Sequence, residues 1–164
     1  MPKYPPSVKD ELLHRAKKEQ SLRQLWEKDL ESQKIIDKIR KVDINNTAFL
    51  KKVVKRYGWP KISEVGKKVA MAAWLILQHS PDKKFMEECL SLMEVMPDEV
   101  EPTNLARTID RVRILNGKLQ YYGTHFRQKS DGKYEIMPTE DKKHLEKRRK
   151  AMGLPTVEEM LKRI

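Results

Sequence analysis

The hydrophobic positions along this chain recur mainly at the spacing of α-helices. Apolar residues follow near-helical intervals in the N-terminal part, which predicts helices over residues 7–41 with a break near residues 29–32. Ser7, followed by Asp10, has the pattern of a capping box that begins the first of them. The Asp and Asn residues of "VDINNT" predict the N-cap of a further helix through "AFLKKVVKRY", which Gly58 ends.

The most apolar stretch of the chain, "VAMAAWLIL", predicts a central buried helix over about residues 62–79. One stripe of this helix carries Val65, Val69, Ala72, Ile76 and His79. Trp74 and Leu77 lie outside the stripe and are also apolar. Other helices are therefore expected to surround this one.

Two more helices complete a helical core predicted over residues 46–116. Asp82 is expected to cap the first of them, because "SPD" interrupts the preceding helix. Its buried side carries Phe85, Met86, Cys89, Leu90 and Met93. The second has apolar residues at Leu105, Ile109 and Val112, and stops before Asn116-Gly117.

The pattern changes after this core. "KLQYYGTHF" and "KYEIMP" are short, aromatic and β-prone. Asp131-Gly132 between them is a turn signal, which predicts a β-hairpin over about residues 119–137.

Helical spacing then returns, which predicts C-terminal helices over residues 139–163. Thr139 is expected to be an N-cap and Gly153 a C-terminal stop. Residues 1–164 are thus expected to form a single domain of the mostly α class. Its architecture would be a helical bundle around the central buried helix, with the small β-hairpin packed on it.

The composition of the chain indicates the cellular compartment in which the protein is expected. Cys89 is the only cysteine among 164 residues, so no internal disulfide can form, as is usual in a reducing compartment. The N-terminal "MPKYPPSVKDELL" lacks the apolar core of a signal peptide. The uncharged apolar run over residues 69–77 is too short to cross about 30 Å of hydrocarbon. A cytoplasmic protein without a membrane partner is expected.

The net charge of +11 is unevenly distributed. Residues 47–68 carry seven Lys and Arg against one acid, whereas residues 69–101 carry two Lys against seven acids. The basic segment could contact an acidic partner or nucleic acid, or it is only the solvated face of a helix. Its cations lie opposite apolar residues such as Val53, which favours the second interpretation. Nucleic-acid binding is therefore expected to be weak and non-specific.

Several short motifs follow one another in a fixed order: "RYGWP", "AAWLILQH", "DR", "LQYYGTHF" and, near the end, "RR" with "GLP". In these motifs the chain resembles an uncharacterised bacterial domain family of unknown function, over nearly its whole length. Members often have Gln where His125 stands and a less basic surface, which speaks against a family-wide nucleic-acid role. The resemblance implies a location for a site but no reaction.

His79 ends the apolar stripe, and a His ring exchanges protons near neutral pH. It either caps the last carbonyls of its helix or serves as a general acid or base, which needs an orienting carboxylate. Asp110 is the candidate for that carboxylate, so His79 and Asp110 are the candidate catalytic residues. Arg111 would bind an anionic substrate group, with Gln78 as a further substrate-binding candidate. The alternative for Asp110 and Arg111 is an ordinary surface ion pair.

Three further substrate-binding candidates come from "QYYGT". The period of two places Gln120, Tyr122 and Thr124 on one face of a strand. Gly123 would let a ligand or another backbone approach closely. The alternative is a hairpin whose aromatic side chains complete the core.

Metal and cofactor chemistry has weaker support. His79 and Asp82, with Asp110 or His125, could hold a metal ion, but no His-x-x-x-His or Cys pair is present, so no metal and no cofactor is expected. Cys89 lies on the apolar side of its helix, which makes it a poor nucleophile. The chain has no Gly-rich phosphate loop, nucleotide fingerprint or Gly-x-Ser-x-Gly elbow.

Two functions from different classes are consistent with these features. The first is a small enzyme that acts on a polar small molecule or peptide group, with His79 in proton transfer and a small polar or anionic ligand as substrate. The second is a non-catalytic binding protein. In that case the polar cluster is structural, and the basic segment over residues 47–68 contacts an acidic partner.

Overall fold

The computed structural model describes residues 3–163. It is 67% helical, and the described residues form eight α-helices and a two-stranded antiparallel hairpin, which confirms the predicted mostly α class. The chain groups into two compact units, one through Leu92 and one from Met93 onward. The single-domain organisation stays a prediction.

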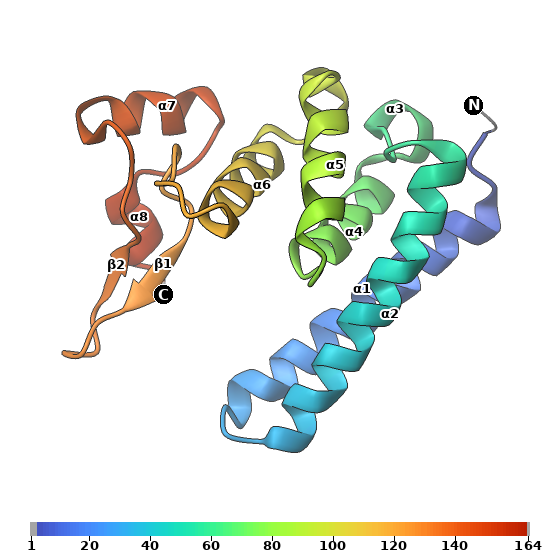
Figure 1. Ribbon diagram of the computed structural model, residues 1–164, viewed down its shortest axis with the longest axis horizontal. Helices are drawn as coiled ribbons and strands as arrows, with labels where there is room; N and C mark the ends of the chain where they lie inside the picture. Colours follow the sequence, from blue (N-terminus) through green and yellow to red (C-terminus); the bar gives the residue numbers. More distant parts are fainter. Residues whose placement is uncertain (1–2, 164) are drawn as a thin grey trace. The chain divides into compact units, whose positions relative to one another are not determined.

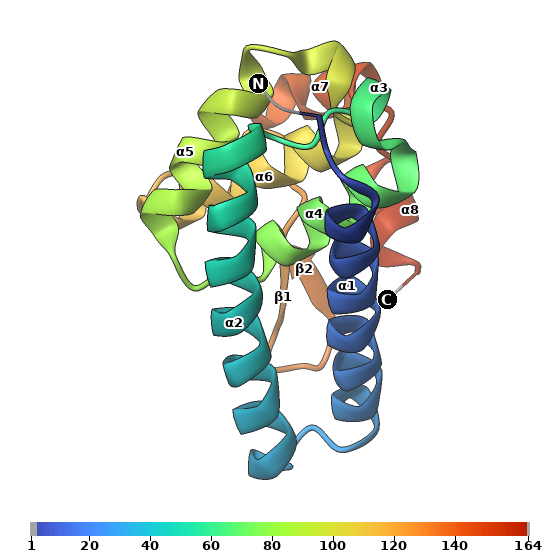
Figure 2. The same cartoon turned by 90° about the vertical axis from the view of Figure 1, so that its right-hand side faces the viewer.

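The first unit is built from helices. It contains α1 (Pro6–Lys28), α2 (Gln33–Tyr57), α3 (Ile62–Val65), α4 (Lys67–Gln78) and most of α5 (Lys83–Glu94). α1 and α2 lie antiparallel and side by side, joined by the loop over residues 29–32 where the sequence predicted a break (Figures 1 and 2). α4 packs against both of them.

α4 supplies much of the core of the first unit. Ala73 and Leu77 are completely buried and Trp74 is 7% exposed, which confirms the predicted central buried helix. This helix begins later than expected, because Gly66 separates it from the four-residue helix α3. Gly66 has a φ of +81°, which glycine adopts readily and which a continuous helix does not allow.

The start of α2 was predicted wrongly. This helix runs without interruption through "VDINNT", where the sequence predicted an N-cap. The side chains that would have capped a new helix bind α1 instead. Arg23 donates to Asp43, and Arg15 donates to Asn45 and Asn46. Contacts with α1 thus take up the side chains that would otherwise cap a helix locally.

The start of α1 also differs from expectation. Its N-cap is Pro5 and no side chain caps it, so the capping box expected at Ser7 is absent. Proline at the first helical position lacks the N–H that would otherwise need a partner. The Tyr4 hydroxyl donates to the carbonyl of Gly58 at 2.6 Å, which joins the start of α1 to the end of α2. Gly58 ends α2 as predicted.

The second unit combines shorter helices with the hairpin. Its elements are a 3₁₀ turn (Pro97–Glu99), α6 (Pro102–Leu115), β1 (Phe126–Gln128), β2 (Tyr134–Ile136), a second 3₁₀ turn (Lys142–His144), α7 (Leu145–Ala151) and α8 (Val157–Leu161). The two strands pair antiparallel, with Phe126 opposite Ile136. Gly132 at the predicted turn has a φ of +80°, so the predicted turn is confirmed.

The segment before β1 is not a regular strand, contrary to expectation. Residues 120–125 form a loop, joined to the rest of the unit by an isolated parallel bridge between Gln120 and Thr139. Thr139 takes part in that bridge and does not cap a helix, since Asp141 and His144 are the N-caps of the second 3₁₀ turn and of α7. α7 begins only at Leu145. Gly153 follows α7 with a φ of +66°, as expected for a C-terminal stop.

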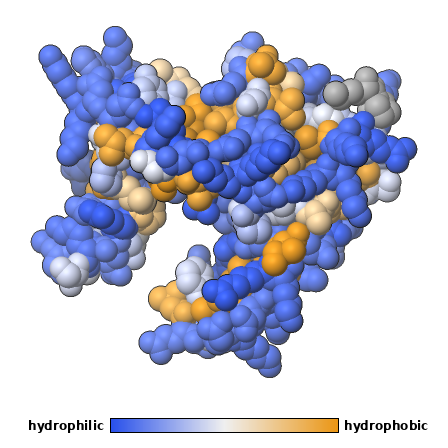
Figure 3. All heavy atoms as spheres, in the orientation of Figure 1, coloured by the Kyte–Doolittle hydropathy of each residue, from blue (hydrophilic) through white to orange (hydrophobic). Residues whose placement is uncertain are grey.

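Hydrophilic side chains cover most of the face shown in Figure 3. Some apolar side chains stay exposed in the α1–α2 hairpin. Leu25 of α1, Leu30 of the connecting loop and Ile44 of α2 are each more than half exposed. Every helix within residues 3–163 is too short or too polar to cross a lipid bilayer.

Candidate functional site

His79 stands at the C-terminal end of α4. Gln78 is the last helical residue, and Pro81 prevents the helix from continuing because it lacks an N–H and clashes with the preceding turn. The His79 backbone accordingly leaves the helical region, with φ −101° and ψ 7°. Nδ1 of its ring lies 2.6 Å from Oε1 of Glu19 on α1. The packing of α4 on α1 therefore brings a His ring against a carboxylate.

Glu19 is a buried carboxylate held by several donors. It is 1% exposed. Its Oε1 contacts His79 and accepts from Nε of Arg23, and its Oε2 accepts from Gln20 at 2.9 Å. Burial alone would raise the pKa of Glu19, but the hydrogen bonds from His79, Arg23 and Gln20 outweigh it and hold the pKa below its ordinary value. Glu19 is therefore ionised at neutral pH.

Arg23 links Glu19 to Asp43 of α2. Its Nη2 donates to both carboxylate oxygens of Asp43, at 3.0 and 2.8 Å. Burial raises the pKa of Asp43, and the charge of Arg23 offsets only part of that effect. Glu19, Arg23, Asp43 and His79 are called the His79 cluster below. It gathers side chains from α1, α2 and the end of α4.

The His79 ring has one nitrogen held and the other available. Because Nδ1 lies 2.6 Å from an ionised carboxylate, we assign the proton of the neutral ring to Nδ1, the nitrogen on the side of Glu19. Among residues 3–163, Nε2 has no hydrogen-bond partner, and 29% of the side chain is exposed. An imidazole oriented in this way can accept a proton at Nε2 and return it.

Sequence reasoning missed Glu19, although a signal was present. Leu12, Ala16 and Glu19 are the buried residues of α1, at the spacing of one helical stripe. A carboxylate on an otherwise apolar stripe indicates a buried partner, since acidic side chains are almost never fully buried unpaired. The sequence does not identify that partner, because it comes from another helix.

Asp110 has its own set of partners within the second unit. It is completely buried on α6. Its Oδ1 accepts from the backbone N–H of Tyr121 and Tyr122, at 2.7 and 2.9 Å. Its Oδ2 accepts from both the N–H and the hydroxyl of Thr124, at 2.9 and 2.8 Å. One carboxylate thus gathers the donors of a loop, which explains why this segment does not continue as a strand.

Gln120 fixes the same loop from the other side. Its side-chain Oε1 accepts from the N–H of His125 at 2.7 Å, and its Nε2 donates to the carbonyls of His125 and Met137 at 3.0 and 2.9 Å. Gly123, at φ +62°, approaches its own chain closely, because an added Cβ would lie 3.2 Å from the Thr139 side chain. The structure therefore brings Gln120, Tyr122 and Thr124 together in one loop, held by Asp110 of α6.

Arg149 also holds the loop over residues 120–125, and sequence reasoning did not identify it. It is completely buried on α7. Its Nη1 donates to the carbonyls of Tyr122 and Gly123, both at 2.8 Å, and its Nε donates to that of Pro155 at 2.8 Å. Burial lowers the pKa of Arg149 from its usual value. The "RR" pair was visible in the sequence, but nothing in the pattern separates a buried Arg from its exposed neighbours.

The two remaining candidates lie in different units. Gln78 is 9% exposed at the end of α4, and Arg111 is half-buried on α6. Each of them interacts with another residue of the chain. His125, near Arg111 in the second unit, has its pKa lowered to about 4, first by burial and then by the Arg111 charge. Its ring is therefore neutral at physiological pH.

A family model described as a family of unknown function, DUF6624, matches residues 6–164. This chain belongs to that family. The match confirms the resemblance seen in the motifs, which led to a family of unknown function. Comparison of this DUF6624 chain with curated proteins and with solved structures found no match.

The remaining candidates for chemistry in the DUF6624 chain are metal ligands and the thiol of Cys89. No group of three or more His, Cys, Asp and Glu side chains within residues 3–163 is arranged to hold a metal ion. Asp82 instead caps α5 by accepting from the N–H of Phe85 at 2.9 Å, as predicted, and pairs with Lys51. Burial raises the pKa of Cys89 to about 12, which keeps its thiol protonated.

Proposed function

We propose that this chain is a cytoplasmic enzyme in which His79 transfers a proton to and from a polar small molecule or peptide group. Glu19 orients the ring through Nδ1, and Nε2 is the reacting atom. One observation carries the proposal: a buried, ionised carboxylate lies 2.6 Å from one nitrogen of a His ring that keeps 29% exposure.

The placement of Glu19 supports a role beyond packing. Removing a carboxylate from water costs several kcal/mol even after relaxation, and a well-packed apolar side chain could fill the same volume. The His79 cluster keeps that carboxylate ionised with three donors, while the imidazole it holds retains solvent access. Such an arrangement fixes both the tautomer and the orientation of a base.

Arg23 and Asp43 would act as positioning residues. Arg23 holds Glu19 through Nε and Asp43 through Nη2, so it locks the carboxylate against rotation. The two carboxylates that Arg23 joins differ in pKa. The pKa of Asp43 lies above its ordinary value, and the pKa of Glu19 lies below it. Two carboxylates with different proton affinity beside one His would let the cluster keep Glu19 charged during a proton transfer.

The test is the His79→Gln variant. Gln can donate one hydrogen bond to Glu19 but cannot transfer protons near neutral pH. We expect the free energy of unfolding to stay within about 1 kcal/mol of the wild type. Turnover of small esters, amides or phosphate esters should fall about 10²- to 10⁴-fold, which is the usual contribution of a general base.

The matched control is His144→Gln, which removes an exposed His whose Nδ1 lies 2.8 Å from Asp141. This change should leave both stability and turnover unaltered. A structural His79 predicts the opposite pattern, with a stability loss of about 1–3 kcal/mol from an unsatisfied buried partner. That loss, or turnover that persists in His79→Gln, would contradict the proposal.

A further inference from the structure

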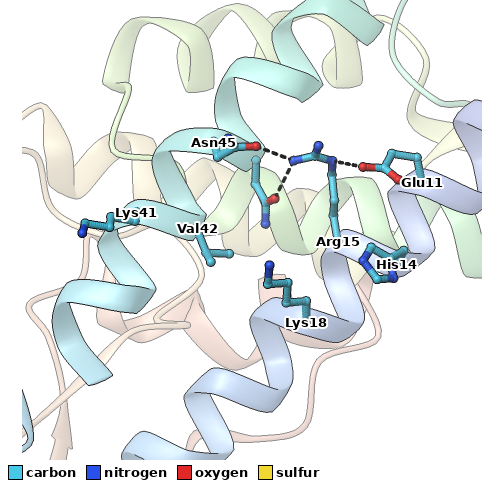
Figure 4. Close-up of a pocket in the computed structure, with 8 residues that line it drawn as sticks. Glu11, His14, Arg15, Lys18, Lys41, Val42 and Asn45 are labelled. Atoms are coloured by element: carbon cyan, nitrogen blue, oxygen red, sulfur yellow. Dashed lines mark hydrogen bonds and ion pairs between the residues drawn. The ribbon is translucent and has the colours of Figure 1, made fainter. Parts of the chain in front are cut away.

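A pocket of about 260 Å³ lies between α1 and α2 (Figure 4). It is lined by Glu11, His14, Arg15 and Lys18 of α1 and by Lys41, Val42, Asn45 and Asn46 of α2. None of these residues belongs to the His79 cluster. The volume is slightly below the range of ordinary small-molecule sites, so it fits a small metabolite or the charged end of a larger one.

Arg15 is held rigidly at one side of this pocket. Its Nη1 donates to Oδ1 of Asn45 at 2.7 Å and to Oδ1 of Asn46 at 3.2 Å, and its Nε lies 2.7 Å from Glu11 (Figure 4). The guanidinium also stacks over the Phe49 ring, 4.4 Å from the centroid. Glu11 is therefore occupied with Arg15 and does not neutralise the other cations of the pocket.

Asn46 leaves a buried donor without an acceptor. The residue is 4% exposed, and its Nδ2 has no hydrogen-bond partner within residues 3–163. The orientation of the amide is not arbitrary, because Arg15 can only donate and so requires the oxygen of Asn46 on its side. An unsatisfied buried N–H costs free energy, which a ligand carrying an acceptor would recover.

The charge of the pocket selects the kind of acceptor. Figure 4 shows the Lys18 side chain reaching from α1 into the space between the two helices, where no residue of the described chain pairs with it. Lys41 lies at the edge of the pocket on α2 and is exposed. An orphan N–H beside uncompensated ammonium groups fits an oxygen anion rather than a neutral acceptor.

We infer that this pocket binds a small organic anion through a phosphate or carboxylate group. One anionic oxygen accepts from Nδ2 of Asn46, and Lys18 supplies the main charge contact, with Lys41 turning in from the edge. The inference does not rest on the proposed function, since the residues of the pocket and of the His79 cluster are separate.

The test follows the side-chain amide of Asn46 by NMR during titration with inorganic phosphate, with glycerol phosphate and with succinate. We expect a saturable shift of that amide with at least one of the three, and the preferred probe distinguishes a phosphate from a carboxylate ligand. Lys18→Gln should weaken binding about tenfold, as expected for the loss of a charge-assisted contact. Asn46→Asp removes the donor and adds a repelling charge, so it should abolish binding.

The matched control is Lys17→Gln, which removes the same charge from the neighbouring position of α1, outside the pocket. Its affinity should stay within about twofold of the wild type. Equal weakening by both Lys variants would show that only the general positive charge attracts the probe, and would overturn the inference. So would an Asn46 amide that shows no saturable shift with any of the three anions. His79→Gln should bind as the wild type does, so failure here is distinguishable from failure of the proposed function.

Discussion

At the scale of single residues, the candidate site depends on one carboxylate that the fold buries. Glu19 is 1% exposed and holds both Arg23 and His79. Truncating Glu19 to Ala would leave these two cationic or protonatable groups facing a cavity. We expect the free energy of unfolding to fall by about 3–5 kcal/mol, as when one partner of a buried ion pair is removed.

Urea unfolding measures this loss. Glu158→Ala is the comparison, because Glu158 forms the same type of pair with Lys162 but on the surface, where its side chain is 77% exposed. That variant should unfold like the wild type, since exposed pairs contribute little. If Glu19→Ala lowered the free energy of unfolding as little as Glu158→Ala does, the buried ion pairs of Glu19 would not stabilise the fold.

His125 gives the second unit a dependence on pH. Burial lowers the folded-state pKa of His125 to about 4, from 6.5 for an exposed His. Between these pH values the unfolded chain binds a proton that the folded chain does not. Stability therefore falls as the pH is lowered from about 6.5 to about 4, by roughly 1–3 kcal/mol. His125→Gln should flatten this part of the stability curve, measured by denaturant unfolding at several pH values. A curve of unchanged slope in the variant would contradict the assignment.

The residues themselves were predictable to different degrees. His79 was identified from its place at the end of an apolar stripe, and Asp110 from its place beside another. Their partners were not, because the sequence does not show which side chain or backbone group of another segment lies against a given residue. The carboxylate on His79 is Glu19, whereas Asp110 accepts from the backbone of residues 121–124.

At the scale of elements, α4 carries the core of the first unit. Trp74 is 7% exposed on this helix. The helix packs against both α1 and α2. We expect Trp74→Ala to cost about 3–5 kcal/mol, because it leaves a large cavity. Met71→Ala, at a position 37% exposed on the same helix, should cost far less. Thermal and denaturant unfolding of the two variants would compare them, and equal losses would argue against α4 as the core helix.

Helices were predictable where the apolar periodicity extends over several turns. Their ends were predictable where one residue type sets the end without a partner from another segment. Gly58 and Asp82 fulfilled their expected roles because a positive φ and an N-cap are local properties. The predictions failed where tertiary partners compete with local ones. Asp43 and its neighbours bind α1 instead of capping α2, and Asp110 draws residues 121–124 away from a strand.

At the scale of the whole molecule, the charge of +11 predicts electrostatic but unselective contacts. Lys51, Lys52, Lys55 and Arg56 are exposed on α2, opposite the buried Val53, which is the arrangement of a solvated face. We expect only weak binding to duplex DNA or RNA, with an affinity that is independent of sequence and falls steeply with salt. Fluorescence anisotropy over a range of salt concentrations would measure it. A tight, sequence-selective complex at physiological salt would contradict this view of the surface.

The most direct test of the central claim is the protonation of the His79 ring, read by long-range ¹H–¹⁵N NMR at about pH 8, where free imidazole is neutral. The exposed His14, whose ring has no carboxylate partner among the described residues, serves as an internal reference. The proposed role of Glu19 predicts that the proton of His79 resides on Nδ1 and that Nε2 is unprotonated and free to act as a base. A His79 ring with its proton on Nε2, or one that divides it between the two nitrogens as a free imidazole does, would contradict the account.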